Sequence, residues 1–121
     1  MNRFKYAIHG CFTLLKKDAN YLYHLIISII VLIVATYLNL SSLQWLMLVL
    51  AIFLVLITEA INTAIEYVVD LITSEYHPFA KHAKDIGAFS VLLASIFAVI
   101  VGLVIFLPKI IKLGELYGIY K

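Results

Sequence analysis

The chain has 121 residues, of which 64% are apolar and 13% are charged, and its formal net charge is +2. A soluble domain usually has roughly a quarter of its residues charged, so this composition excludes an ordinary soluble protein and indicates a membrane protein. The small net charge, with no basic stripe, argues against nucleic-acid binding. A chain of this length forms one domain, residues 1–121.

The residues before the first long apolar run predict an amphipathic helix over about residues 2–19. Apolar side chains recur there at intervals of three and four residues, and basic side chains occupy much of the remaining surface. The apolar positions are Phe4, Ile8, Cys11, Phe12 and Leu15, and the basic ones are Arg3, Lys5, His9, Lys16 and Lys17. An ordinary soluble helix end would show similar spacing. Because a membrane span follows closely, we expect a helix in the headgroup region.

Three stretches are long enough to cross a membrane, which takes about 20 mostly apolar residues. They run over about residues 22–40, 43–72 and 86–107. The short connection between the first two predicts an antiparallel hairpin. The third stretch is expected to end at Pro108, because proline cannot continue a helix interior. The expected fold class is an all-α membrane protein with three transmembrane helices and an N-terminal surface helix.

The distribution of basic residues predicts the orientation of the chain, because such residues gather in cytoplasmic segments. Placing the N-terminus and the second loop in the cytoplasm puts six of them inside: Arg3, Lys5, Lys16, Lys17, Lys81 and Lys84. The remaining three would lie outside: Lys109, Lys112 and Lys121. We therefore expect the N-terminus to be cytoplasmic.

A row of polar side chains continues from the second apolar stretch. Glu59, Asn62, Glu66 and Asp70 are spaced three, four and four apart, which places them within an arc of roughly 80° on a helix. Acids at membrane depth are costly and normally face the protein interior or a water-filled cavity. The row is therefore expected to begin at the cytoplasmic interface and to continue into the cytoplasm.

Further polar groups reach the same level, because Asp18 precedes the first span and Lys84 and Asp85 precede the third. One interpretation is a set of interhelical salt bridges and helix caps. That interpretation leaves several acids competing for few cations, and oxygen ligands of this kind suit Mg²⁺. Mg²⁺ commonly links carboxylates to substrate phosphates. The chain has no glycine-rich phosphate loop, so side chains and metal would have to hold any nucleotide.

The segments 59–70, 74–77 and 83–85, taken together, resemble the signature of the bacterial diacylglycerol kinase and undecaprenol kinase family. The resemblance extends from Phe4 to the third span. It implies a homotrimer in the bacterial plasma membrane, with active sites shared between neighbouring subunits on the cytoplasmic side. It also implies a lipid kinase with ATP as co-substrate and Mg²⁺ as cofactor.

The resemblance also implies roles for individual residues. Glu59 would be the general base that takes the proton from the lipid hydroxyl, and Asp18 and Glu66 would bind Mg²⁺. The family usually has Glu where this chain has Asp18. Asp is one methylene shorter, so a metal ligand there must be brought closer by the backbone.

The remaining roles concern the two substrates. Asn62 would hold substrate or phosphate, Lys84 would neutralise phosphate charge, and Asp85 would orient Lys84 and the lipid headgroup. The positions that match nucleotide contacts of the family are Tyr6, Gly10, Asp70, Glu75 and His77.

The segment around Asp18, Asn20 and His24 resembles the acid-x-Asn-x-x-x-His version found in undecaprenol kinases of Gram-positive bacteria. We therefore expect phosphorylation of undecaprenol to undecaprenyl phosphate, with diacylglycerol as the alternative acceptor. A small proton-coupled transporter would also use a membrane acid, but near the midplane and facing a pathway open alternately to each side. A structural membrane subunit would explain the spans without explaining the acids.

Overall fold

The computed structural model describes residues 3–118 and consists of four helices joined by short connections. They are α1 (Arg3–Lys17), α2 (Ala19–Thr36), α3 (Ser42–Ile72) and α4 (Pro78–Leu116). Helices α2, α3 and α4 are each long and apolar enough to cross a membrane. The prediction of an all-helical chain with three helices suited to spanning a membrane is confirmed.

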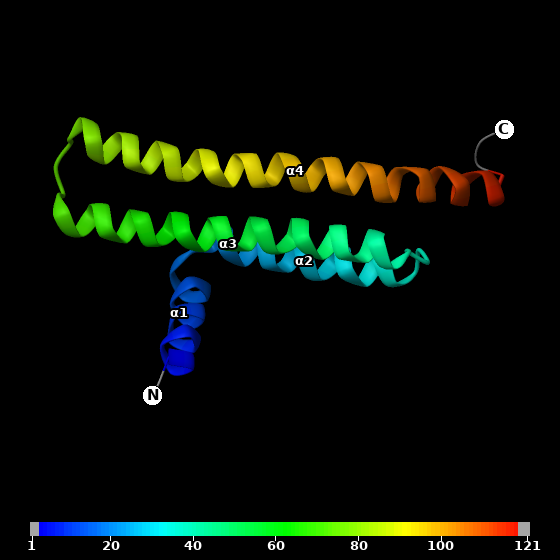
Figure 1. The fold of residues 1–121 in the computed structure, drawn as a ribbon, viewed down its shortest axis with the longest axis horizontal. Helices are drawn as coiled ribbons and strands as arrows, with labels where there is room; N and C mark the ends of the chain where they lie inside the picture. The colour runs from blue at the N-terminus through cyan, green and yellow to red at the C-terminus, as the bar shows by residue number, and fades with distance from the viewer. Residues whose placement is uncertain (1–2, 119–121) are drawn as a thin grey trace.

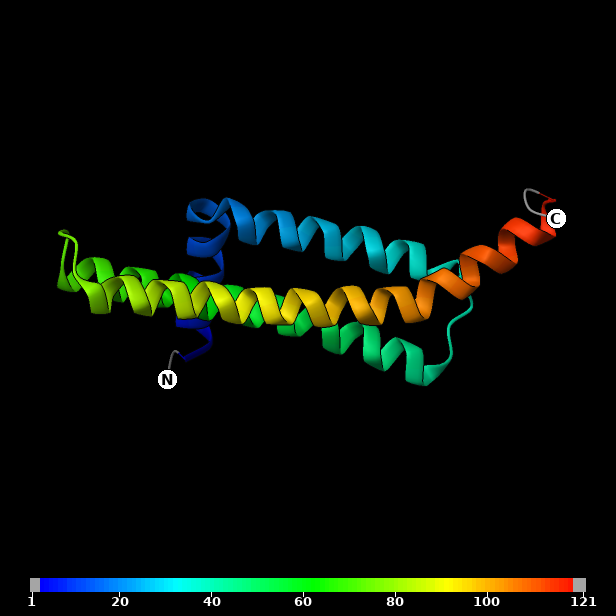
Figure 2. The same cartoon turned by 90° about the horizontal axis from the view of Figure 1, so that it is seen from above.

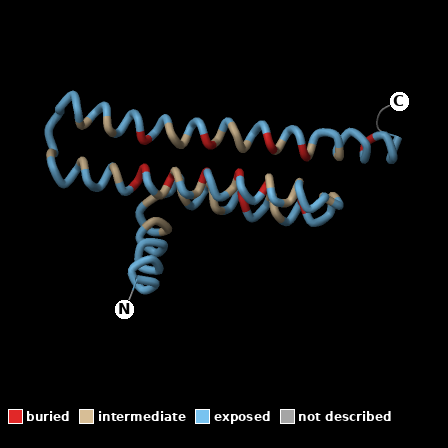
Figure 3. The backbone as a smooth tube through the Cα atoms, in the orientation of Figure 1, coloured by how far each residue is buried: buried red, intermediate tan, exposed pale blue. Residues whose placement is uncertain are grey.

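The long helices pack as a small bundle. Helices α3 and α4 run antiparallel beside each other, and α2 lies against α3 (Figure 1; Figure 2). Buried residues lie on the facing sides of α3 and α4 (Figure 3), and the central cluster consists of Ala35, Leu48, Ala51, Val101 and Ile105. Most other large apolar side chains of these helices are exposed, as is required of a surface that contacts lipid or another subunit.

Two polar caps determine where α2 and α3 begin. The backbone N–H of Tyr21 donates to Asp18 Oδ1 at 3.2 Å, which caps α2. The backbone N–H of Gln44 donates to Ser41 Oγ at 3.2 Å, and Ser41 N–H donates to Gln44 Oε1 at 3.0 Å, which forms a capping box on α3. Helices α2 and α3 run in opposite directions and contact each other (Figure 1; Figure 2), so the predicted hairpin is confirmed.

The first apolar stretch is shorter as a helix than expected. Helix α2 ends at Thr36 rather than near residue 40, because the next three residues form a turn. Asn39 in this turn has a φ of 54°, in the left-handed region, which Asn tolerates better than most residues.

Helix α4 is longer than expected at both ends. It begins at Pro78, whose fixed φ suits the first helical position, and His77 Nδ1 caps it by accepting from Phe79 N–H at 3.1 Å. The prediction that this helix ends at Pro108 is wrong, because α4 continues to Leu116. The proline removes one backbone donor and bends the helix, as Figure 2 shows near its C-terminal end. In apolar surroundings the remaining backbone groups keep their internal partners, so the helix resumes.

Helices α3 and α4 extend beyond the start of α2 toward the connection at residues 73–77 (Figure 1). Helix α1 leaves the bundle at a steep angle near the start of α2 (Figure 1). We call the part of the bundle that carries Glu59, Glu66 and Asp70 the acidic end. It lies where three segments meet: the α1–α2 junction, α3 and the first turns of α4.

Candidate functional site

The row of polar residues on α3 passes from the bundle interior into water. Glu59, Asn62 and Thr63 are buried, with 5%, 8% and 8% of their surface exposed. Glu66 and Asp70, one and two turns farther along, are exposed. A base at Glu59 would therefore act largely shielded from water, while the later acids remain accessible to a charged, water-soluble ligand.

Asp18 is tied to this row by a side-chain hydrogen bond. Thr63 Oγ1 donates to Asp18 Oδ2 at 2.5 Å, although the two residues are 45 positions apart in the chain. The other carboxylate oxygen of Asp18 caps α2. Asp18 therefore joins the start of α2 to the polar face of α3.

The two predicted Mg²⁺ ligands, Asp18 and Glu66, line the same cavity of about 160 Å³, together with Lys17, Thr63, Tyr67 and Asp70. Among residues 3–118, no cluster of three or more His, Cys, Asp or Glu side chains is arranged to hold a metal ion. Mg²⁺ is commonly bound by one or two carboxylates plus substrate phosphates and waters. Two carboxylates on an open cavity fit such a site, which phosphate oxygens would complete.

Asn62 lies between the buried and exposed acids. Its Nδ2 donates to Glu66 Oε1 at 3.5 Å, which is a long hydrogen bond. Its Oδ1 is buried and has no hydrogen-bond partner within the described residues. Helix α4 packs against this side chain at Gly87, and the substrate-holding role of Asn62 stays a prediction.

His24 is a neighbour of Glu59 that sequence reasoning did not identify. Its Nε2 lies 3.8 Å from Glu59 Oε2, and its side chain is 31% exposed. The sequence linked His24 only to the choice of lipid. A histidine in an otherwise apolar membrane run is itself a signal of function, and that signal could have assigned it to the site.

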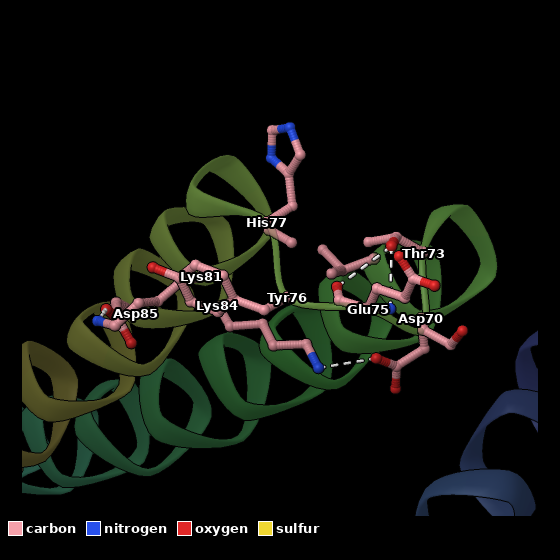
Figure 4. Close-up of a pocket in the computed structure, with 11 residues that line it drawn as sticks. Asp70, Thr73, Glu75, Tyr76, His77, Lys81, Lys84 and Asp85 are labelled. Atoms are coloured by element: carbon pink, nitrogen blue, oxygen red, sulfur yellow. Dashed lines mark hydrogen bonds and ion pairs between the residues drawn. The ribbon is translucent and has the colours of Figure 1, made fainter.

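A second, more open pocket of about 350 Å³ lies at the turn between α3 and α4 (Figure 4). Five predicted site residues line it: Asp70, Glu75, His77, Lys84 and Asp85. Lys81 also lines it and was not predicted. Figure 4 shows Lys84 reaching toward Asp70, whereas the ring of His77 points away from that pair.

Two ion pairs order the charges of this pocket. Lys84 Nζ lies 2.7 Å from Asp70 Oδ1, and Lys81 Nζ lies 2.6 Å from Asp85 Oδ2. Asp85 therefore pairs with Lys81, one helical turn away, and not with Lys84, because adjacent helix residues point in different directions. Lys84 lies before the apolar run of α4. The hydrogen bond to Asp70 raises the pKa of Lys84, so its ammonium group stays charged at neutral pH.

The remaining predicted residues, Tyr6 and Gly10, lie on α1 and are exposed. Helix α1 projects away from the bundle, apart from the α3–α4 turn (Figure 1). The structure thus brings Asp18, Glu59, Asn62 and Glu66 together at the acidic end, and it does not bring Tyr6 and Gly10 to the pocket of the same chain.

Comparison with known proteins identifies the family of the chain. Residues 5–106 match the family described as prokaryotic diacylglycerol kinase. The chain is 38% identical to the undecaprenol kinase of Bacillus subtilis (strain 168) over 107 residues, which cover 88% of this chain and 87% of that protein. It is 40% identical to the diacylglycerol kinase of Synechocystis over 111 residues, which cover 91% of this chain and 63% of that protein. It is 44% identical to the diacylglycerol kinase of Escherichia coli (strain K12) over 68 residues, 56% of each chain. The chain belongs to the prokaryotic diacylglycerol kinase family.

Proposed function

We propose that this lipid kinase transfers the γ-phosphoryl group of ATP to undecaprenol, with diacylglycerol as the alternative acceptor. The observation that carries the proposal is the gradient of burial along one face of α3. Glu59 is 5% exposed, whereas Glu66 and Asp70 are open to water. A lipid hydroxyl can approach the buried end from the bilayer while the nucleotide approaches the exposed end from the cytoplasm.

In this reaction Glu59 accepts the proton of the lipid hydroxyl as the hydroxyl oxygen bonds to the γ-phosphorus. The bond from that phosphorus to the oxygen bridging to the β-phosphate breaks, and ADP leaves. Phosphoryl transfer depends mainly on positioning and charge stabilisation. Lys84 is suited to neutralise phosphate charge because it is already charged and lines the pocket at the α3–α4 turn, which we call the nucleotide pocket.

Asp18 and Glu66 would hold Mg²⁺ beside Asn62, and the bound ion would neutralise charge on the phosphates of ATP. Both carboxylates line one cavity. Thr63 holds Asp18 in place, and Asn62 contacts Glu66. The chain's own contribution is thus to hold two acidic ligands near Glu59, on the side that the nucleotide would approach.

Two observations favour undecaprenol over diacylglycerol. The similarity to a protein named undecaprenol kinase covers 88% of this chain and 87% of the relative. In addition, His24, which belongs to the segment that resembles Gram-positive undecaprenol kinases, lies 3.8 Å from Glu59. A side chain at that place would contact whichever lipid hydroxyl reaches the base.

The proposed assembly is a homotrimer in the bacterial plasma membrane, with α1 on the cytoplasmic surface and active sites shared between subunits. It is supported by the large exposed apolar surface of α2 to α4. It is also supported by α1, which carries the exposed residues Tyr6 and Gly10 and projects away from the bundle, apart from the α3–α4 turn of its own chain (Figure 1). The α1 helix of a neighbouring subunit would have to supply these contacts.

The direct test is a side-by-side assay in mixed detergent micelles. Purified protein is given ATP, Mg²⁺ and either undecaprenol or diacylglycerol, and the lipid phosphate and ADP are both quantified. We expect equal amounts of the two products, faster turnover of undecaprenol, and no turnover without Mg²⁺. Preferred turnover of diacylglycerol would reverse the choice of lipid, and lack of turnover with both lipids would contradict the proposed function.

A further inference from the structure

Gly87 makes an unusually close approach to Asn62. A Cβ atom placed on Gly87 would lie 2.3 Å from Asn62 Oδ1 and 3.4 Å from Asn62 Cγ. Real Cβ atoms essentially never approach another heavy atom within 3.0 Å. Both residues are buried, and the atom that a Cβ would meet is the end of the Asn62 side chain, so this amide would have to shift. With Asn62 in this position, glycine alone fits at residue 87.

The two ends of the Asn62 amide have different neighbours. Its Oδ1 faces the backbone of α4, where the glycine hydrogen in place of a Cβ can make a weak Cα–H···O contact. Its Nδ2 faces Glu66 Oε1 at 3.5 Å. The reverse orientation would direct the amide oxygen at a carboxylate and lose that donor. Gly87 therefore leaves the space in which Asn62 can direct its N–H₂ group toward Glu66.

We propose that Gly87 is a positioning residue for phosphoryl transfer, acting through Asn62. It permits α4 to approach α3 closely beside Asn62, which lies between Glu59 and Glu66 along α3. Any side chain at position 87 would displace the Asn62 amide and release Glu66 from its contact. This inference rests on the proposed function, in which Glu66 holds Mg²⁺ and Glu59 is the base.

The test compares Gly87→Ala with Gly102→Ala. Both positions lie inside α4, but a Cβ at Gly102 would have nothing within 4 Å, so the second variant controls for the general effect of adding a methyl group to this helix. Asn62→Ala and the double variant Gly87→Ala/Asn62→Ala complete a double-mutant cycle. The unsubstituted protein and these four variants are compared in detergent. We measure kcat and the Mg²⁺ concentration that gives half-maximal rate. We also measure the thermal midpoint with and without Mg²⁺ and ATP.

We expect Gly87→Ala to lower kcat by roughly 10- to 100-fold, the scale of a misplacement of about 1 Å, and to require more Mg²⁺. It should also lose most of the rise in thermal midpoint that Mg²⁺ and ATP produce. In the Asn62→Ala background the same exchange should change none of these quantities. If Gly87→Ala alone is too unstable to purify, recovery of folding in the double variant would support the steric contact.

Two results would overturn the inference. Additive losses in the double variant would mean that Gly87 acts on general packing and not through Asn62. A lower thermal midpoint with unchanged kcat and Mg²⁺ requirement would mean that the contact is structural only. Failure of the proposed function would look different, because the unsubstituted protein would then not turn over either lipid. In that case the stabilisation by Mg²⁺ and ATP would still decide whether Gly87 acts through Asn62.

Discussion

The exchange Glu59→Gln tests the proposed proton acceptor with little disturbance to the fold. Glutamine has nearly the same size and shape as glutamate, so packing around a residue that is 5% exposed should survive. An amide cannot accept the hydroxyl proton. A well-placed general base contributes about 100- to 10,000-fold, so kcat should fall at least about 100-fold, which corresponds to about 2.7 kcal/mol of activation free energy.

The assay follows ADP release and lipid phosphate at saturating ATP and Mg²⁺. Stabilisation of the variant by Mg²⁺ and ATP should remain near that of the unsubstituted protein, because Glu66 and Asp70 lie about two and three turns farther along α3 than the exchanged residue. Glu115→Gln is the matched control. It makes the same chemical change on an exposed residue near the opposite end of α4, and it should leave kcat unchanged. A kcat within about threefold of the unsubstituted value would remove Glu59 from the role of base.

Three other predictions concern the metal, the assembly and the nucleotide. Glu66→Gln and Asp18→Asn should reduce the rate most at low Mg²⁺ and recover partly as Mg²⁺ rises, whereas an equal loss at every Mg²⁺ concentration would make these acids structural. Mixing Asp18→Asn subunits with Glu59→Gln subunits should restore activity through hybrid sites; no recovery in oligomers shown to be mixed would place the whole site in one subunit. Lys84→Met should raise the KM for ATP about tenfold, the scale of one lost charged contact, with little change in thermal midpoint, because its pair with Asp70 is exposed. A normal KM with a large fall in midpoint would contradict the phosphate role.

Periodicity predicted much of the fold because it reports which residues share a face. The three apolar stretches, the hairpin and the spacing of Glu59, Asn62, Glu66 and Asp70 all follow from helical repeat and length. The extent of α4 did not follow from these rules. Pro108 stops most helices, but in apolar surroundings continuing the helix with a bend leaves fewer backbone groups without partners, and α4 extends to Leu116.

The contacts between particular residues of different helices could not be predicted from the sequence. A repeat along one helix shows that Asn62 faces inward, yet it does not show that Gly87 is the residue it meets. The same holds for His24 beside Glu59 and for the pairing of Lys84 with Asp70. These neighbours depend on how far one helix is shifted along another, which is determined by side-chain packing over the whole interface.

In the proposed arrangement, the junction at Asp18 would let the thickness of the membrane influence the rate. Asp18 is the one non-helical residue between α1 and α2, and Thr63 holds it to α3. In the proposed arrangement, α1 follows the headgroup plane while α2, with 18 residues, spans about 27 Å of a hydrocarbon core of about 30 Å. A thinner or thicker bilayer would move α1 relative to α3 and pull on the Asp18–Thr63 hydrogen bond. Turnover in vesicles of short-chain and long-chain phosphatidylcholines should therefore pass through an optimum thickness, and Thr63→Val should shift or flatten that optimum. Rates independent of chain length in the unsubstituted protein would show that Asp18 does not transmit bilayer thickness to the site.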